Sequence, residues 1–366
     1  MNSRPKILRE IKRIGWQLLN IGGPVLGLLR RMHYDATSHS SMHVTDGFGE
    51  KHEDMAVVLI YQPNHILKSL LFQLDFLNSK KIGILLVCNH ELKAEYREEL
   101  RGRCWKIIER PNIGYDFGGY RDGILFLLSE PQPPRNLFVL NDSIWFPLSR
   151  DCDVLERARA SDADVYGIFY NDKSKRNSHH HLQSYFYRFN HTVVSSKKFR
   201  ALWKNMPLLN KKQDVIIKLE KKITGKLKAR GFTIDYTHSS KSIEEAITRL
   251  NDWELSEICE FYKSYLTYLN INYNSIFKNT DSFKQSDLRK NILGSRFIYY
   301  FIDSHPLIFI RELSSPFIKK SRDLNYVIQR KEIIDGGYLD RVEPVIRREI
   351  LQWDDDDTRI RRKAPA

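Results

Sequence analysis

Short apolar runs recur along the first half of the chain, and each run is continuous instead of alternating with polar residues. The first, Met55-Ala-Val-Val-Leu-Ile-Tyr61, is rich in β-branched residues and is followed by Pro63. Strands that are buried on both faces have this composition, because neither face meets water. The pattern predicts buried strands over residues 55–61, 82–88, 105–108, 136–140 and 165–170.

The segments between these runs carry apolar residues at helical spacing or a dense mixture of charges. After the first run, Leu67, Leu70, Leu74 and Leu77 recur every three or four residues. Strands that alternate with helices predict a mostly parallel sheet joined by right-handed crossovers. We predict helices over 65–78, 91–102 and 119–129, and a sixth strand over 181–189, where large apolar and polar residues alternate.

The chain is therefore predicted to have an α/β fold whose C-terminal part is helical. Ser242-Ile-Glu-Glu245 has the pattern of a capping box, which predicts a helix from there through Phe261. The predicted organisation has five parts: a basic amphipathic segment over 1–32, a linker over 33–54, a main α/β domain over 55–240, a mainly helical region over 241–353 and a charged tail over 354–366.

The composition allows a packed core and favours an anionic partner. Of the 366 residues, 42% are hydrophobic, and the formal net charge is +14. Such an excess favours nucleic acid, nucleotide diphosphates or acidic lipid headgroups. The chain has no zinc-finger spacing and no RNA-recognition signature, so we expect no nucleic-acid partner. The four cysteines form no CxxC pair, which fits a reducing cytoplasm better than a zinc cluster or a disulfide framework.

The N-terminal segment has a modest apolar stretch between basic flanks. Residues 14–29 are apolar but are interrupted at Gly22-Gly23-Pro24, and the stretch is shorter than the ~20 residues of a spanning helix. No cleavage-type ending follows it. Basic flanks suit a helix that lies in the interface of an anionic membrane. The alternative is a helix docked on the protein's own core. We therefore expect a cytoplasmic protein, and the sequence leaves both alternatives open: contact with the inner face of the plasma membrane, or docking on the core.

A glycine-rich turn follows the third predicted strand. Between Arg110 and Gly123 four glycines precede or open a helix, and such a turn lets the backbone approach a phosphate at a helix N-terminus. Asp116 complicates this interpretation, because a carboxylate repels phosphate unless a cation or a sugar hydroxyl lies between them. The alternative is a sharp turn in which Asp116 caps the helix.

A second polar cluster, Asn141-Asp142-Ser143, ends the fourth predicted strand. A carboxylate at the end of a buried strand either caps something or binds a cation, and oxygen ligands suit Mg²⁺ or Mn²⁺. The alternative is an Asx-turn that closes the strand. Ligands of parallel sheets bind beyond the carboxyl ends of the strands, where this cluster and the glycine-rich turn are both expected.

Other polar residues offer weaker candidates for chemistry. Three consecutive histidines end at His181, but successive residues of a strand point to opposite faces, so at most two could share a metal ion. A solvated loop is the favoured interpretation of these histidines. Asp164 and Asp172 flank the fifth predicted strand, and either could act as a general base towards an acceptor hydroxyl.

At these residues the chain resembles the rhamnan synthesis protein F family of bacterial polysaccharide and lipopolysaccharide O-antigen biosynthesis. The resemblance covers roughly residues 55–320, and residues before 50 and after 325 lie outside it. It is carried by Arg110-Pro-Asn-Ile-Gly-Tyr-Asp-Phe-Gly-Gly-Tyr120, by Val139-Leu-Asn-Asp-Ser143, by Leu182-Gln-Ser-Tyr-Phe186, by Val215-Ile216 with Glu220 and Thr224, and by Pro316-Phe-Ile-Lys319.

That family is similar to GT-A glycosyltransferases, which implies a GT-A-like nucleotide-sugar-binding domain over 55–240. The resemblance implies transfer of a sugar, rhamnose being one candidate, from a nucleotide-sugar donor to a growing polysaccharide or O-antigen on a lipid carrier. Asn141-Asp142-Ser143 stands where those enzymes carry an Asp-x-Asp metal motif, with one acid instead of two. The missing acid leaves a second hypothesis open, a non-catalytic polysaccharide-assembly factor with a degenerate transferase fold.

The resemblance also gives the predicted site residues their roles. Asp142 would hold the divalent cation, and Asp116 and Asp172 are the candidate catalytic acids. The residues that would bind the nucleotide-sugar are Tyr61, Asn89, Asn112, Gly114, Asp116 and Asn141.

Overall fold

The computed structural model describes residues 23, 25–37, 41–172, 179–268, 288–294 and 304–354. One large sheet has the strand order β1-β4-β3-β2-β5-β9-β7-β10, and β8 pairs with β7. Its strands are β1 (His43–Asp46), β2 (Asp54–Ile60), β3 (Ile82–Cys88), β4 (Lys106–Glu109), β5 (Asn136–Asn141), β7 (Val165–Asn171), β8 (His181–Leu182), β9 (Phe186–Asn190) and β10 (Ile234–Ser239).

The central strands β4, β3, β2 and β5 are parallel, as are β7 and β10, whereas β9 runs antiparallel between β5 and β7. The predicted fold class, a mostly parallel α/β sheet flanked by helices with a helical C-terminal part, is confirmed. Alternate residues of β2 enter two different cores: Ala56 and Val58 pack on one face, and Val57 and Leu59 pack on the other. Because both faces are covered, the run is apolar throughout.

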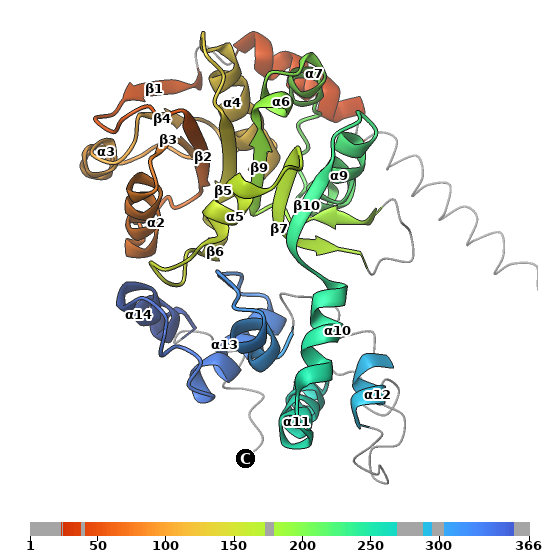
Figure 1. Cartoon of the computed structure of the whole chain (residues 1–366). Helices are drawn as coiled ribbons and strands as arrows, with labels where there is room; N and C mark the ends of the chain where they lie inside the picture. Colours follow the sequence, from red (N-terminus) through yellow and green to blue (C-terminus); the bar gives the residue numbers. More distant parts are fainter. Residues whose placement is uncertain are drawn as a thin grey trace, which may run out of the picture.

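Helices cover both faces of the sheet (Figure 1). The helices of the first 250 residues are α2 (Lys68–Ser79), α3 (Ala94–Arg101), α4 (Tyr115–Ser129), α5 (Val154–Ala160), α6 (His191–Val194), α7 (Lys197–Lys204), α8 (Lys212–Val215), the π-helix η2 (Ile216–Glu220), α9 (Lys221–Lys228) and α10 (Ser240–Arg249). The core on one face contains side chains of α4, α7 and α9, and the core on the other contains side chains of α2, α5 and the C-terminal helices.

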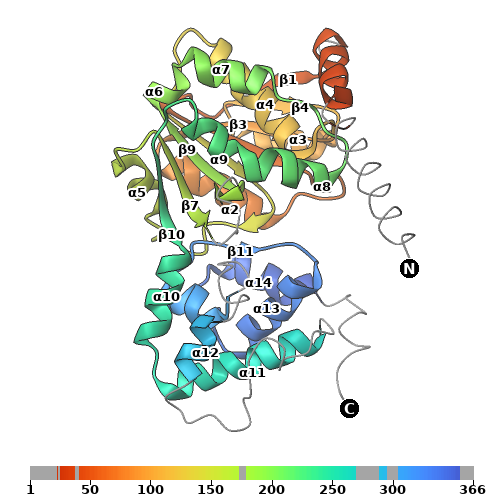
Figure 2. The same ribbon diagram turned by 90° about the vertical axis from the view of Figure 1, so that its right-hand side faces the viewer.

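The C-terminal helices gather at one end of the sheet (Figure 2). They are α10, α11 (Asp252–Tyr268), α12 (Leu288–Gly294), the π-helix η7 (Leu307–Glu312), α13 (Leu324–Asp335) and α14 (Pro344–Trp353). The short strand β11 (Ile318–Lys319) returns to the sheet edge and pairs with β6 (Ile144–Trp145), which directly follows the turn after β5. Residues more than 170 positions apart in the sequence therefore meet at the carboxyl end of β5.

Several local predictions need correction. The helix cap lies three residues earlier than predicted: Ser239 caps α10, with Ser242 as its reciprocal partner. The predicted continuous helix through Phe261 is two helices, because Leu250 has extended backbone between α10 and α11. The segment predicted as a linker contains the end of a helix over 25–37 and strand β1, and the predicted sixth strand is the pair β8 and β9.

The glycine-rich turn is held by a buried ion pair. The Arg110 guanidinium donates from Nε to Asp122 Oδ2 at 2.7 Å and from Nη2 to the carbonyl of Ile113 at 2.7 Å, and its Nη1 donates to Asn89 Oδ1. Tyr34, from the helix over 25–37, donates to the same Asp122 oxygen at 2.7 Å. These contacts connect β3, β4, α4 and the N-terminal helix in one buried network.

We predict that Asp122→Ala lowers the free energy of unfolding by about 3–5 kcal/mol, because it leaves the Arg110 guanidinium buried without its carboxylate. Asp75→Ala is the matched control, since it removes an exposed carboxylate from its pair with Arg103 and should cost less than about 1 kcal/mol. Urea denaturation of both variants measures the difference. Equal losses would show that the buried pair has no special role.

Candidate functional site

A cavity of about 630 Å³ opens beside the carboxyl end of β5. Its wall is formed by the first turn of α4, the turn after β5, the segment before β9, the π-helix η2 and the returning C-terminal segment. The residues that line the cavity include Tyr115, Asp116, Phe117, Asn141, Ser143, His181, Ser184, Lys212, Glu220, Lys221, Lys319, Asp323 and Tyr326. Since ligands of parallel sheets bind at the carboxyl ends of the strands, this cavity is the candidate site.

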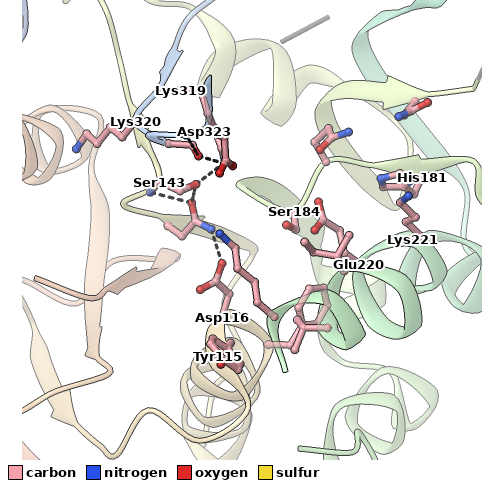
Figure 3. Close-up of a pocket in the computed structure, with 18 of the residues that line it drawn as sticks. Tyr115, Asp116, Ser143, His181, Ser184, Glu220, Lys221, Lys319, Lys320 and Asp323 are labelled. Carbon is pink, nitrogen blue, oxygen red and sulfur yellow. Dashed lines mark hydrogen bonds between the residues drawn. The ribbon is translucent and has the colours of Figure 1, made fainter. Parts of the chain in front are cut away.

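One wall of the cavity is a chain of hydrogen bonds that starts at the glycine-rich turn (Figure 3). Asn141 donates from Nδ2 to Asp116 Oδ2 at 3.1 Å, and its Oδ1 accepts from the Ser143 hydroxyl at 2.6 Å. The Lys319 ammonium donates to that hydroxyl at 2.8 Å. The chain joins both predicted polar clusters, through Asp116 and Asn141, to a lysine from the C-terminal segment.

The carboxyl group of Asp116 has a raised pKa. Its pKa is raised from 3.8 to about 6, mainly by burial and also by the Asp142 charge, while Lys319 opposes the increase. Asp116 is half-buried in the first turn of α4. This helix begins directly after Gly114, which adopts a left-handed conformation with φ 83°. At neutral pH the carboxyl is therefore mostly ionised but close to its protonated form, as an acid–base group would be.

The opposite wall carries a second carboxylate. Figure 3 shows Glu220 with Ser184 and His181 across the cavity from Asp116 and Ser143. Glu220 ends the π-helix η2, a type of helix that is frequent at functional sites. Burial lowers the pKa of His181, whose Nδ1 lies 2.7 Å from the carbonyl oxygen of His179. The cavity thus has Asp116 on one wall and Glu220 on the other, and Asp323 of the C-terminal segment also lines it.

Three other predicted residues line a neighbouring hollow of similar volume, about 630 Å³. Tyr61, Asn89 and Asn112 meet there, beyond the ends of β2, β3 and β4. Asn89 connects this hollow to the first cavity, because its Nδ2 donates to Asn112 Oδ1 at 3.2 Å and to the carbonyl of Tyr115 at 3.3 Å. Of the predicted site residues, Asp116 and Asn141 therefore line the first cavity, and Tyr61, Asn89 and Asn112 line the hollow beside it.

The structure gives Asp142 and Asp172 other partners. Asp142 Oδ2 accepts 3.0 Å hydrogen bonds from the backbone N–H of Tyr61 and from Gln62 Nε2. This carboxylate therefore connects the segments that follow β5 and β2. Asp172 Oδ1 accepts from the backbone N–H and hydroxyl of Ser240 at the start of α10. Neither aspartate is among the residues that line the two hollows.

The residues at the expected metal position do not fit a divalent cation. Asp142 Oδ2 and Asn141 Oδ1 already accept two hydrogen bonds each, and the Lys319 ammonium lies against Ser143. Over the described part of the chain, no three His, Cys, Asp or Glu side chains gather as metal ligands do. A lysine at this point would repel Mg²⁺ or Mn²⁺.

Two site residues, Lys319 and Glu220, were given no role by the sequence pattern. Both stand in segments that carry the family resemblance, which is the only sequence signal that could have found them. Nothing local in the sequence predicts that β11 returns to β6 or that η2 turns Glu220 inward.

Comparisons with known proteins agree with that resemblance. The family profile described as Rhamnan synthesis protein F matches residues 84–263. A relative named "Uncharacterized protein y4gN" from Sinorhizobium fredii is 44% identical over 352 residues, which cover 95% of this chain and 92% of the relative.

Two solved structures of mannosyltransferases are distant likenesses of this chain. A mannosyltransferase from Pyrobaculum calidifontis, in complex with GDP-Man and Mn²⁺, is 10% identical with a TM-score of 0.33 and covers 93% of this chain and 94% of its own. The mannosyltransferase Ktr4p from S. cerevisiae is 10% identical with a TM-score of 0.26 and covers 44% and 63%. Likenesses this distant carry no argument about the site.

The raised pKa of Asp116 predicts a pH-dependent effect on stability. The ionised carboxylate opposes folding, so the stability of the wild-type protein relative to Asp116→Asn is greatest below pH 4 and falls as the pH rises through about 6. Allowing for partial exposure, we expect a change of about 1–2 kcal/mol between pH 4 and pH 7.5. Urea denaturation of both proteins at the two pH values measures it, and a pH-independent difference would contradict the assignment.

Proposed function

The chain belongs to the rhamnan synthesis protein F family, and from this membership and the two-walled cavity we propose that it is a glycosyltransferase of polysaccharide synthesis that uses a nucleotide-sugar donor. The observation that carries the proposal is the cavity itself. It faces the carboxyl edge of a parallel sheet and combines three acids, Asp116, Glu220 and Asp323, with several lysines. This combination suits a substrate with a sugar, which needs acid–base groups, and a diphosphate, which needs cations.

The two adjoining hollows match the two ends of such a donor. We propose that the nucleoside lies in the hollow of Tyr61, Asn89 and Asn112, where an aromatic ring and amides suit a base and a ribose. The diphosphate would cross the Asn89–Tyr115 connection at the amino end of α4, near Gly114. The sugar would then lie between Asp116 and Glu220.

In the proposed reaction the bond between the anomeric carbon and the diphosphate oxygen breaks, and its electron pair stays on the leaving nucleoside diphosphate. An acceptor hydroxyl oxygen forms the new bond to that carbon and gives its proton to a carboxylate. We propose Glu220 as this base, because its carboxylate lines the cavity whereas Asp172 is occupied at the start of α10. Asp116, hydrogen-bonded to Asn141, would hold hydroxyls of the donor sugar.

The finer identity of the substrates is also part of the proposal. Rhamnose as the transferred sugar is supported by the family's description alone. The acceptor would be a growing glycan on a lipid carrier, as in polysaccharide or O-antigen synthesis, which suits the net charge of +14 near an anionic membrane.

A polysaccharide-assembly factor without catalytic activity is the second candidate. The observation that favours it is the use of Asp142 as a structural hydrogen-bond acceptor at the place expected to bind a metal ion. Such a factor would bind glycan or partner transferases without turning over a donor. Calorimetric titration with UDP, GDP and dTDP separates the two, since only the transferase requires one of them to bind.

We predict that Glu220→Gln lowers the rate of sugar transfer by about 10²–10⁴-fold, because it removes the base but keeps the shape of the side chain. Transfer from labelled UDP-, GDP- and dTDP-sugars to membrane acceptors measures the rate, and calorimetry should find unchanged nucleotide affinity. Glu245→Gln, an exposed glutamate on α10, is the control and should be fully active. Full activity of Glu220→Gln would exclude Glu220 as the base.

The helix over 25–37 offers a surface for the proposed membrane contact. Its inner side docks on the protein: the carbonyl of Gly27 accepts from the Leu208 N–H at 3.0 Å, and Tyr34 is buried. Its outer side presents Val25, Leu26, Leu29 and Met32, each more than half exposed. An apolar stripe on a basic protein fits the interface of an anionic membrane. No helix within the described ranges is both long and apolar enough to span the bilayer.

Replacing Val25, Leu26, Leu29 and Met32 together by serine is predicted to weaken binding to phosphatidylglycerol vesicles by about tenfold or more, because it removes the apolar stripe. Vesicle sedimentation measures binding. The control replaces Trp253 and Leu351 by serine. These are exposed apolar residues of the C-terminal helices, and the control should bind vesicles as the wild type does. The membrane proposal fails if the wild-type protein does not sediment, or if both variants sediment equally well.

A further inference from the structure

The Lys319 ammonium is held inside the cavity wall without a carboxylate partner. It donates to the Ser143 hydroxyl at 2.8 Å and lies 5.3 Å from the centre of the Tyr185 ring. Over the described ranges, no Asp or Glu oxygen lies within ion-pair distance of it. Burial lowers the pKa of Lys319, with Glu220 and Asp116 opposing that effect from farther away.

A half-buried cation without a close counter-ion is costly unless an anionic ligand completes its surroundings. Lys319 lines the cavity, so an anionic ligand in the cavity can reach its ammonium, which Ser143 and the Tyr185 ring contact from the wall. The neighbouring Lys320 behaves differently: its ammonium donates to Ser69 at 3.1 Å, and Figure 3 shows its side chain pointing away from Asp116 and Ser143.

Lys319 also lies beside the cluster that was expected to hold a metal ion. Its ammonium contacts Ser143, the last residue of the cluster that stands in place of an Asp-x-Asp motif, and the chain of hydrogen bonds leads from there to Asp116. We propose that Lys319 takes the role of a divalent cation and binds the diphosphate of the donor directly. This inference rests on the proposed function.

In this arrangement Lys319 stabilises the leaving group. When the bond to the anomeric carbon breaks, the electron pair remains on the terminal phosphate of the nucleoside diphosphate, and the ammonium donates a charge-assisted hydrogen bond to that phosphate. The backbone N–H of Lys320 donates to the Ser143 carbonyl at 2.9 Å, which fixes the strand that carries Lys319 beside the cavity.

The test compares nucleoside diphosphates with the corresponding monophosphates by calorimetry, in EDTA and in Mn²⁺. Wild-type protein is expected to bind the diphosphate of one base equally well in both buffers. Lys319→Gln should weaken diphosphate binding by about tenfold or more and leave monophosphate binding unchanged, because only the terminal phosphate reaches the ammonium. Lys319→Arg should recover most of the affinity, and Lys241→Gln, an exposed lysine on α10, is the control.

The outcomes separate this inference from the proposed function. If no nucleotide binds the wild-type protein, the proposed function fails. If the wild-type protein binds a diphosphate only with Mn²⁺, or if Lys319→Gln binds it as tightly as wild type, the role of Lys319 is wrong while the transferase proposal stands. Circular dichroism and urea denaturation of the variants exclude misfolding as the cause of lost binding.

Discussion

The arrangement of the site depends on the buried Arg110 guanidinium. It holds the Ile113 carbonyl of the glycine-rich turn, the Asn89 side chain at the end of β3 and the Asp122 carboxylate on α4. Since a planar guanidinium offers donors in fixed directions, these three groups cannot move independently. Asn89 in turn contacts Asn112 and Tyr115, so this one guanidinium is linked through Asn89 to the walls of both hollows.

The C-terminal segment contributes to the site as well as to the core. Ser143 and Lys319 are 176 residues apart in the sequence, yet they share a hydrogen bond because β11 pairs with β6. The same segment is anchored on its far side, where Arg330 donates to the carbonyls of Lys319 and Ser321 at 2.8 Å. The returning C-terminal segment is therefore part of the cavity wall and positions the Lys319 ammonium at the end of the sheet.

The sequence predicted the central strands, because continuous apolar runs such as 82–88 are hard to explain except by burial on both faces, but it did not predict the edge strands β1 and β10. It also predicted that Asp116 and Asn141 would share an edge, which follows from parallel strand direction alone. It could not predict that Asp142 turns towards the Tyr61 N–H, since the choice between a metal and a backbone donor depends on the neighbouring strand. The cap at Ser239 was missed for a similar local reason: two serines three residues apart both suit the motif.

A single acid at the end of β5 first suggested a weakened or inactive metal site. The contacts allow a different interpretation. A second acid is not needed to bind a metal ion, because the Lys319 ammonium already supplies a positive charge at this point. A lysine ammonium carries one positive charge where a divalent ion carries two, so neighbouring donors must supply the rest. In this proposal Lys212, which lines the same cavity and is exposed, and the positive end of the α4 dipole provide them. On this view the single carboxylate at the end of β5 and the presence of Lys319 belong to one electrostatic arrangement, because an ammonium and a divalent cation at this position would repel each other.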